Sequence, residues 1–292
     1  MSGVDFLSHS TQNQKMKEAL EMALSTASSP SPLLIVGAAG TGKTSLAKWI
    51  HQKGRPGKNI RILGARELRD RAQSLFEALS DAREGTLVVE EVDILNEPSQ
   101  ALLMEVLESR HSGSDRCRFI FTSRRDLRAL VRGGHFRQDL FYKVTVLTSY
   151  LPSLAERLED LDMLLGFMVD VHSILQGKQG LQISSEALSQ LRSWDWPGNI
   201  RELENVVERA VTLATSSSID SFCIRFESPD QVEASDFGPG MSLSEVERRL
   251  ILQTLELTAQ NRTRAAQMLG ISIRTLRNKL NEYKDGGVRE SL

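Results

Sequence analysis

The amino-acid sequence predicts an α/β fold built on a mostly parallel sheet, followed by a small helical subdomain and a separate small all-α domain. Three observations lead to this prediction. Short apolar runs alternate with helical stretches in the first half of the chain, helical periodicity alone follows, and a basic helical segment comes last. A chain of 292 residues is long enough for about two domains.

The first half, residues 1–150, is expected to form one α/β domain that includes a short amphipathic helix over 11–27. Apolar runs predict strands at 33–36, 86–89 and 119–122. Helical stretches lie between them, at 44–51 and 98–108. Strands that alternate with helices in this way are typical of βαβ units, whose strands are parallel.

The second half contains helical patterns only, and residues 151–226 are expected to form a helical subdomain. Its last helix begins with Asn199 as the expected N-cap and Glu202 three residues later. Residues 227–240 are acidic and rich in Pro, Gly and Ser, which predicts a linker. The final domain, 241–292, has helical runs at 242–258, 263–269 and 272–283.

Composition places the chain among globular proteins, with 40% hydrophobic and 25% charged residues. No apolar stretch is long enough to span a bilayer, and residues 1–5 do not resemble a secretory signal, so a cytoplasmic location without membrane contact is expected. Cys117 and Cys223 lack the spacing of a metal site, which favours a reducing compartment. The net charge is −2, but residues 261–284 hold six basic residues against one acidic residue, which favours a nucleic-acid partner for this segment.

A glycine-rich segment with the pattern G-x-x-x-x-G-K-[ST] lies between an expected strand and an expected helix, at Gly37–Thr44. Its backbone N–H groups can surround the β-phosphate of a nucleotide, Lys43 can reach the β- and γ-phosphates, and the Thr44 hydroxyl can bind Mg²⁺. The alternative is a flexible glycine turn, which the strand and helix on either side disfavour. The expected nucleotide-binding residues in this segment are Gly37, Gly40, Thr41, Gly42, Lys43 and Thr44.

The apolar run at 86–89 ends in two carboxylates, Glu90 and Glu91. Carboxylates that follow a strand beside a phosphate loop can position Mg²⁺ and orient the water that attacks the γ-phosphate. Glu90 is therefore the expected metal ligand together with Thr44, and Glu91 is the expected catalytic carboxylate. The alternative is a strand end that carries solvated acidic residues.

Several longer motifs resemble a single family. From 32 to 214 the chain resembles the central AAA+ domain of bacterial enhancer-binding proteins, the NtrC-like sigma-54-dependent activators. The motifs that carry the resemblance are Gly37–Thr44 with the following Ile50–His51, Gly85–Glu91, Arg125–Leu127, Phe136–Tyr142, Leu151–Pro152 with Glu156–Arg157, and Trp196–Asn205. Residues 261–272 resemble the Fis-type helix-turn-helix of the same family. The resemblance implies an AAA+ phosphate-loop sheet with a helical lid, ATP and Mg²⁺ as ligands, and assembly into a higher-order ring.

The resemblance also implies roles for two arginines. Arg137 matches a trans-acting, catalytic arginine finger, and Arg201 matches the sensor II arginine that binds the nucleotide. A guanidinium beside the γ-phosphate stabilises the charge that develops in phosphoryl transfer. Without these motifs, a surface arginine is more simply interpreted as one half of an exposed ion pair.

The sequence departs from the family pattern in ways that bear on hydrolysis and on sigma-54. The family's sigma-54 contact loop, with the hexapeptide Gly-Ala-Phe-Thr-Gly-Ala, has no counterpart between 67 and 78, so sigma-54 is not an expected partner.

Glu90 replaces an aspartate, and its extra methylene displaces a carboxylate beside an ion that requires near-octahedral geometry at about 2.1 Å. Arg124 replaces the sensor I asparagine, and Lys143 replaces a second finger arginine, whose planar fork an ammonium does not reproduce. Weak hydrolysis of ATP is therefore expected.

Fewer than forty residues precede the phosphate loop, so the sensory domain that the family usually carries is not expected in this sequence. Activity is then expected to depend on abundance, on nucleotide or on a partner.

The final domain carries the residues that are expected to bind double-stranded DNA. Gly270 suits the tight turn between two helices, and the second helix presents residues to base edges and phosphates. These residues are Arg274, Thr275, Arg277, Asn278 and Lys279. The alternative is a three-helix protein-interaction module with a solvated basic face. The apolar residues of the preceding helix predict either a dimerisation surface or simple packing onto the other two helices, and they are Leu243, Val246, Leu250, Leu252 and Leu255.

Three functions remain as hypotheses. The first is a DNA-binding transcription regulator whose AAA+ domain binds ATP mainly to control assembly or DNA affinity. The second is an active ATPase that remodels a transcription complex, and the third is an inhibitory partner that joins the ring of a complete family member. The lack of a sigma-54 contact loop favours the first, whereas Glu91, Arg137 and Arg201 favour the second.

Overall fold

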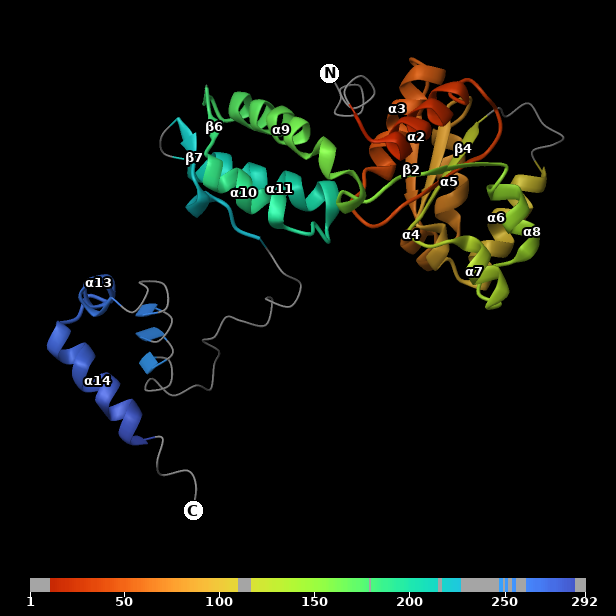
Figure 1. The fold of residues 1–292 in the computed structure, drawn as a ribbon. Coiled ribbons are helices and arrows are strands. Elements are labelled where there is room, and N and C mark those ends of the chain that lie inside the picture. The colour runs from red at the N-terminus through yellow and green to blue at the C-terminus, as the bar shows by residue number, and fades with distance from the viewer. Residues whose placement is uncertain are drawn as a thin grey trace. The chain divides into compact units, whose positions relative to one another are not determined.

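The computed structural model describes residues 11–109, 117–178, 180–214, 217–226, 247–248, 250–251, 254–255 and 261–286. The chain divides into two compact units, Met1–Arg225 and Phe226–Leu292, and each is described by itself (Figure 1). In these ranges, no helix combines the length and the apolar character that are needed to cross a bilayer. Cys117 and Cys223 are both buried free thiols.

A parallel sheet forms the centre of the first unit. Its described strands follow the order β2-β3-β4-β1-β5, and each neighbouring pair is parallel. They are β1 (Leu33–Val36), β2 (Ile60–Gly64), β3 (Thr86–Glu90), β4 (Arg118–Ser123) and β5 (Leu147–Tyr150). The three apolar runs that predict strands lie in β1, β3 and β4, and the predicted α/β fold class is confirmed. β2 and β5 were not predicted, because their residues are less uniformly apolar.

Helices cover the sheet, and the strands are apolar because their side chains are buried on both faces. On one face, Val89 and Phe121 belong to a large buried cluster with residues of α4 to α8. α3 buries Leu46 and Ile50 and contacts β1, β3 and β4, while α2 contacts α3 and β5. The helical elements of this part are α2 (Gln14–Ser25), α3 (Lys43–Gly54), α4 (Ala65–Asp70), α5 (Gln73–Asp81), η1 (Val92–Ile94), α6 (Glu97–Ser109), α7 (Leu127–Arg132) and α8 (Gln138–Val144).

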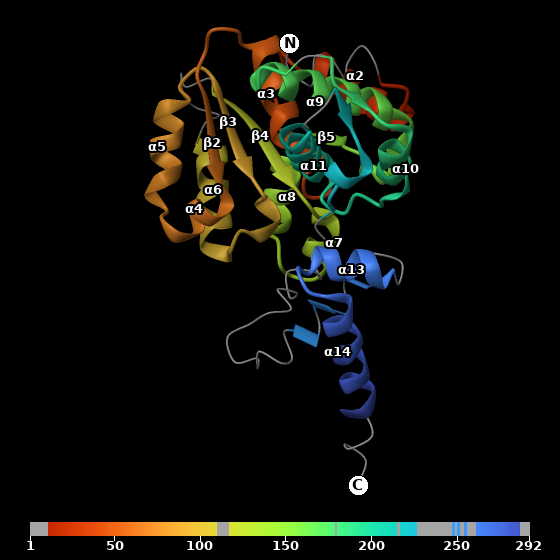
Figure 2. The same ribbon diagram turned by 90° about the vertical axis from the view of Figure 1, so that its left-hand side faces the viewer.

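The connection from β2 to β3 is short and helical. α4 begins directly after Gly64, and α5 begins two residues after the end of α4. Leu68 and Leu75 are fully buried, and both helices contact β2, as Figure 2 shows. The structure describes every residue of this connection. It consists of two packed helices without an extended loop.

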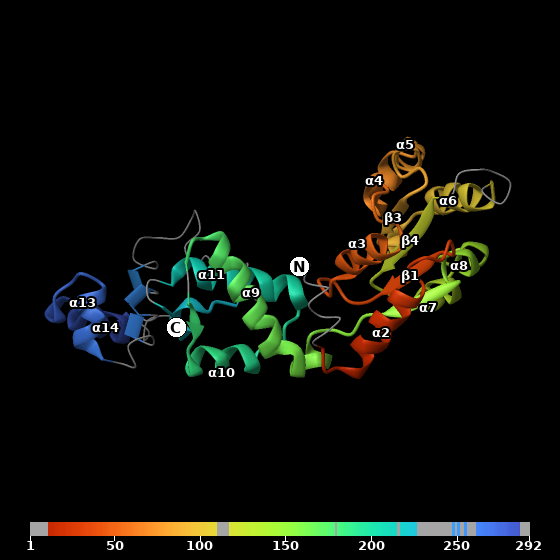
Figure 3. The same ribbon diagram turned by 90° about the horizontal axis from the view of Figure 1, so that it is seen from above.

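The remainder of the first unit is mainly helical, as expected. Its elements are η3 (Ala155–Asp160), α9 (Leu161–Leu175), β6 (Gln182–Ile183), α10 (Ser185–Ser193), α11 (Asn199–Leu213), β7 (Ser218–Ile219) and η4 (Ser221–Cys223). α9 and α11 lie side by side (Figure 3) and bury apolar residues at helical spacing, such as Leu161, Leu165, Val207 and Val211. These elements form the expected lid.

The start of α11 differs from the prediction. Its N-cap is Gly198 rather than Asn199, and Asn199 has a left-handed backbone with φ of 55°. The Asn199 side chain bonds to distant backbone groups, so it does not cap the helix. Glu202 still accepts a hydrogen bond from the Gly198 N–H (2.7 Å), so half of the expected capping arrangement exists.

The second unit contains α13 (Arg262–Met268) and α14 (Ile273–Gly286), and the residues that the structure describes between 247 and 255 are helical as well. Gly270, with φ of 65°, lies in the turn between them, where a residue without a Cβ adopts a left-handed backbone at little cost. Ser272 accepts a hydrogen bond from the Thr275 N–H (3.0 Å) at the start of α14. The expected linker, 227–240, lies outside the described residues, as does most of the expected helix 242–258.

A small apolar core holds the second unit together. Its buried members are Ile251, Leu255, Ala265, Ala266 and Leu276. Because Leu255 belongs to this core, at least part of the preceding helix packs onto α13 and α14. Leu250 is 45% exposed and remains available for another contact. Leu243, Val246 and Leu252, the other residues of the expected dimerisation surface, lie outside the described residues.

Candidate functional site

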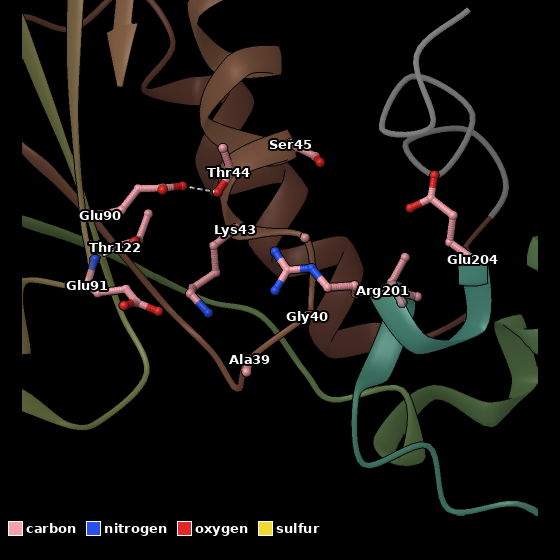
Figure 4. A pocket seen from close by; sticks show the side chains of 12 residues that line it. Ala39, Gly40, Lys43, Thr44, Ser45, Glu90, Glu91, Thr122, Arg201 and Glu204 are labelled. Carbon is pink, nitrogen blue, oxygen red and sulfur yellow. Dashed lines mark hydrogen bonds between the residues drawn. The ribbon is translucent and has the colours of Figure 1, made fainter. Parts of the chain in front are cut away.

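A cavity of about 200 Å³ opens at the carboxyl ends of β3 and β4, beside the N-terminus of α3. Ligands of open parallel sheets bind at this edge. Figure 4 shows side chains that line it, which come from the phosphate loop, from the end of β3 and from α11 of the lid. The sequence-predicted residues Lys43, Thr44, Glu90, Glu91 and Arg201 all line this cavity.

The phosphate loop has the backbone that its glycines predict. Gly40 and Gly42 have φ of 75° and 100°, which glycine adopts without steric strain. The ammonium of Lys43 donates hydrogen bonds to the carbonyls of Gly37 (2.8 Å) and Ala38 (2.7 Å). Burial lowers the pKa of Lys43, a change that the nearby Glu91 partly offsets. A cationic side chain thus lies folded over the loop, where the phosphates of a nucleotide would bind.

Thr41, a further predicted nucleotide-binding residue, has a structural role in this loop. Its side chain is buried, and its hydroxyl donates a hydrogen bond to the carbonyl of Ala38 (2.9 Å). Gly37 begins the loop and donates its N–H to the carbonyl of Ser123 (3.1 Å), which fixes the loop to the end of β4.

Two side-chain oxygen atoms of the kind that bind metal ions lie close together at the side of the cavity formed by β3. The hydroxyl of Thr44 donates a hydrogen bond to the carboxylate of Glu90 (Figure 4). Hydroxyl and carboxylate oxygens are the ligands that Mg²⁺ takes in nucleotide sites, so this pair fits the ion that the motifs imply. The expected metal ligands, Thr44 and Glu90, are therefore adjacent in the fold.

Glu91 follows Glu90 with a strained backbone. Its φ of 57° lies in the left-handed region, and its N–H donates to the hydroxyl of Thr122 (3.1 Å). A residue other than glycine in this region is often part of a functional site, because the surrounding structure must enforce the conformation. The carboxylate of Glu91 is turned toward the cavity, and its Oε1 lies 3.4 Å from Nε of Arg124.

The lid is fastened to the phosphate loop by Asn199. Its side-chain amide donates to the carbonyl of Ala39 (2.9 Å), and its oxygen accepts from the N–H of Leu154 (2.7 Å). Gly40 lies so close to Gly198 that a Cβ on Gly40 would be 2.0 Å from the Gly198 carbonyl oxygen. The contacts with Ala39 and Gly40 join residues about 160 positions apart and fix the lid against the loop.

The same contacts place Arg201 at the cavity. Its backbone N–H is 3.3 Å from the carbonyl oxygen of Gly40, and its guanidinium reaches toward Lys43 (Figure 4). Two cationic groups, from the loop and from the lid, therefore converge on the space between them. This arrangement suits an anionic ligand with several phosphates.

Arg157 also joins the lid to the loop, a role that the sequence did not predict. Its side chain is fully buried, and its Nη2 lies 3.4 Å from the Thr41 carbonyl oxygen. Burial lowers the pKa of Arg157, and the nearby Asp160 partly offsets this. Asn199 and Arg157 both lie in motifs that carry the family resemblance, and that is the signal by which their roles could have been found.

Arg137 lies away from this cavity, as a group that acts on another subunit would. Its guanidinium forms two hydrogen bonds with the carboxylate of Asp139, at 3.1 and 2.6 Å. It is therefore part of an exposed ion pair in the single chain, which raises the pKa of Arg137 through the hydrogen bond to Asp139. Lys143 lies near the end of α8, six residues beyond Arg137, and is half-buried.

In the second unit, the expected DNA-binding residues lie on α14. Arg274, Thr275, Arg277 and Asn278 are exposed. Lys279 is half-buried, and its ammonium pairs with Glu247 of the preceding helix at 2.8 Å. α14 thus presents two arginines at helical spacing, whereas the lysine makes a contact within the unit.

Comparison with protein families covers nearly the whole chain. Residues 7–154 match the sigma-54 interaction domain, residues 155–234 match the AAA+ ATPase lid domain, and residues 242–283 match the Fis family of bacterial regulatory proteins. The chain belongs to the sigma-54 interaction domain family. It carries the AAA+ and Fis-type helix-turn-helix domains of these transcription regulators, so the resemblance seen in the sequence is confirmed.

Members of the family similar to this chain include FlbD of Caulobacter vibrioides, at 36% identity over 94% of the chain and 70% of FlbD. AtoC of Escherichia coli is 35% identical over 91% of the chain and 65% of AtoC. The chain thus spans about two thirds of the length of these family members.

Solved structures show the same fold. NtrX from Brucella abortus, crystallised with ATP, matches 94% of the chain and 68% of NtrX with a TM-score of 0.69 and 23% identity. The RuvB Holliday junction branch migration motor of Thermotoga maritima matches 95% of the chain and 87% of RuvB, with a TM-score of 0.56 and 16% identity.

Proposed function

We propose that this family member is a DNA-binding transcription regulator whose AAA+ domain binds ATP with Mg²⁺ and hydrolyses it slowly. The observation that carries the nucleotide part is the convergence of Lys43, the Thr44–Glu90 pair and Arg201 on one cavity. NtrX, which was crystallised with ATP, supports this ligand by analogy.

The residues around the cavity divide the work of binding. The loop N–H groups and Lys43 bind the β- and γ-phosphates, and Arg201 neutralises phosphate charge from the lid side. Thr44 and Glu90 would hold Mg²⁺, which supplies neutralisation of the developing charge when it is bound. Glu91 would orient the attacking water, and Arg137 would act on the nucleotide of a neighbouring subunit in a ring.

Slow hydrolysis follows from the residues that replace the family's hydrolytic groups. Glu90, Arg124 and Lys143 differ from the family in metal placement, sensing and transition-state charge. A single arginine finger is worth about 10³–10⁵ in rate, so one lysine in such a position has a large cost. An active ATPase is the second candidate function, because Glu91, Arg137 and Arg201 are retained.

Sigma-54 polymerase is not an expected partner, although the matching domain is named for it. In the family the contact loop lies between the phosphate loop and the acidic strand, where this chain forms α4 and α5 with only Arg71 and Ala72 between them. A transcription assay on a sigma-54 promoter tests this. We expect no open complexes with the chain alone, and robust open-complex formation would contradict the proposal.

The DNA-binding part rests on α14, which follows the Gly270 turn and exposes Arg274 and Arg277. We infer that the second unit self-associates, partly through Leu250, and binds an inverted repeat whose half-sites are about one helical turn apart. This partner implies that the protein works in the cytoplasm.

Gel-shift titrations of the full chain at several salt concentrations test this function. Arg274→Ala or Arg277→Ala is expected to cost about 1–3 kcal/mol on the cognate site, because a bidentate arginine–guanine contact is lost. Lys279→Ala is the matched comparison, and we expect a smaller loss because this lysine pairs with Glu247. If removal of both arginines leaves binding unchanged, the DNA contact lies elsewhere, and the inhibitory-partner hypothesis becomes the better one.

A further inference from the structure

The carboxylate proposed to orient water, Glu91, does not lie free in the cavity. Nε of Arg124 is 3.4 Å from its Oε1, and each of the two side chains is 37% exposed. A half-buried ion pair is less screened by water than one on the open surface. The family resemblance does not account for this pair, because an asparagine stands at the position of Arg124 in the family.

The backbone of Arg124 is held in position by the buried side chain of Asp93. The Arg124 backbone N–H donates to Oδ1 of Asp93 (3.1 Å), and the Asp93 side chain is only 1% exposed. Nε of the next residue, Arg125, lies 3.3 Å from the other oxygen of this carboxylate, Oδ2. The Arg125 side chain also donates a hydrogen bond to the Asp93 backbone carbonyl (2.9 Å). Nε of Arg124 is 4.0 Å from Asp93, so its shorter contact is the one with Glu91.

The backbone of Glu91 is held beside this pair. Its left-handed conformation and the hydrogen bond from its N–H to Thr122 fix the direction in which its side chain leaves the backbone. Both side chains also interact electrostatically with Lys43: Glu91 raises the pKa of Lys43, and Arg124 lowers it. The pair therefore lies within electrostatic reach of the group that binds the γ-phosphate.

A carboxylate orients and activates water by accepting its hydrogen bond. A guanidinium on the same carboxylate competes with water for its oxygens. On the basis of the proposed function, we propose that Arg124 is a positioning residue that holds Glu91 in an ion pair and so restrains ATP hydrolysis. Binding of ATP does not need the pair to open, because the loop, Lys43 and Arg201 lie on the other sides of the cavity.

Steady-state ATPase kinetics of the full chain give the first test. Arg124→Asn is expected to raise kcat on the order of tenfold, part of the 10²–10⁴ that a positioned base contributes. KM for ATP should stay within about threefold, and Arg124→Lys should keep kcat low because it keeps a cation beside Glu91. The double variant Arg124→Asn, Glu91→Gln should lose the gain.

Arg125→Asn is the matched control, because Arg125 is adjacent but pairs with Asp93 rather than with Glu91. It should not raise kcat. A kcat for Arg124→Asn at or below the wild-type value, or the same gain from Arg125→Asn, would overturn the proposal.

A second readout does not depend on catalysis. Thermal unfolding without nucleotide is measured for the wild type, Arg124→Asn, Glu91→Gln and the double variant. If the two side chains form a pair, their effects on Tm are not additive, by an amount on the order of 1–3 °C. Additive effects would overturn the ion pair even in a protein that binds ATP. Loss of ATP binding in the wild type, with non-additive effects on Tm, would instead contradict the proposed nucleotide function and leave the pair intact.

Discussion

The two sides of the nucleotide cavity differ in how closely they follow the family. On the binding side, the phosphate loop, Asn199 and Arg201 retain the family motifs and form a connected set of contacts. On the hydrolysis side, Glu90 and Arg124 replace the family residues, and Arg124 occupies the carboxylate of Glu91. On the proposed function, nucleotide binding and nucleotide hydrolysis depend on largely separate residues, with Glu90 shared by both, and the two can diverge within one fold.

The binding side is tested most strongly at Lys43. Lys43→Ala should weaken ATP binding by about 10- to 100-fold, because a charge-assisted contact to phosphate is worth about 1.5–3 kcal/mol. Titration with a fluorescent ATP analogue measures this, and Lys48→Ala, an exposed lysine on the same helix, is the control. Equal affinities for all three proteins would show that this cavity is not the nucleotide site, and would contradict the difference between its binding side and its hydrolysis side.

The fastening of the lid to the loop is tested by a pair of glycine substitutions. Gly40→Ala and Gly42→Ala both place an alanine at positive φ, which costs roughly 1–2 kcal/mol. Only Gly40 faces another group, the Gly198 carbonyl oxygen 2.0 Å from an added Cβ, whereas Gly42 has nothing within 4 Å. Thermal unfolding without nucleotide should therefore show Gly40→Ala less stable than Gly42→Ala, by about 2–4 °C for each further 1 kcal/mol. Equal losses would mean that the lid is not held at Gly40.

A smaller effect concerns Glu156, at the junction of core and lid. Its hydrogen bonds from Lys15 and Ser153 lower the pKa of Glu156 to about 2, from the ordinary 4.5. Because the folded-state pKa is the lower one, this stabilisation is present above pH 4.5 and disappears as the pH falls toward 2. Glu156 is 49% exposed, so solvent screening limits the contribution to roughly 0.2–1 kcal/mol.

Urea unfolding of the wild type and of Glu156→Gln measures this contribution. The wild type should be more stable at pH 7, and the difference should shrink steadily between pH 4.5 and 2. If the difference in stability between the two proteins does not depend on pH, packing rather than the charge of Glu156 stabilises this junction.

Sequence patterns predicted those parts of the fold that depend on local periodicity. The apolar runs of β1, β3 and β4, the phosphate loop and the lid helices follow from residues that are close in sequence. Arg201 was placed at the cavity only by the resemblance, because its position depends on α11 and not on its neighbours in the sequence.

The unpredicted features all depend on contacts between distant residues. Asn199 looks like an ordinary N-cap in the sequence, yet it bonds to Ala39, 160 positions away. The pair of Arg124 with Glu91 forms because β3 and β4 are neighbours in the sheet, and periodicity does not reveal that order. Lys279 looked exposed on its helix, but its partner, Glu247, lies on another helix.

The separation of binding from hydrolysis is tested most directly by following ATP after it binds. The full chain, in excess over γ-labelled ATP with Mg²⁺, is sampled over time, and bound ATP and released phosphate are measured together in a single turnover. We predict that ATP is bound at once and remains mostly unhydrolysed for many minutes, at a turnover rate far below the 1–100 s⁻¹ of typical kinases. Conversion of the bound ATP within seconds would contradict it and would show that Glu90, Arg124 and Lys143 do not impair the hydrolysis side.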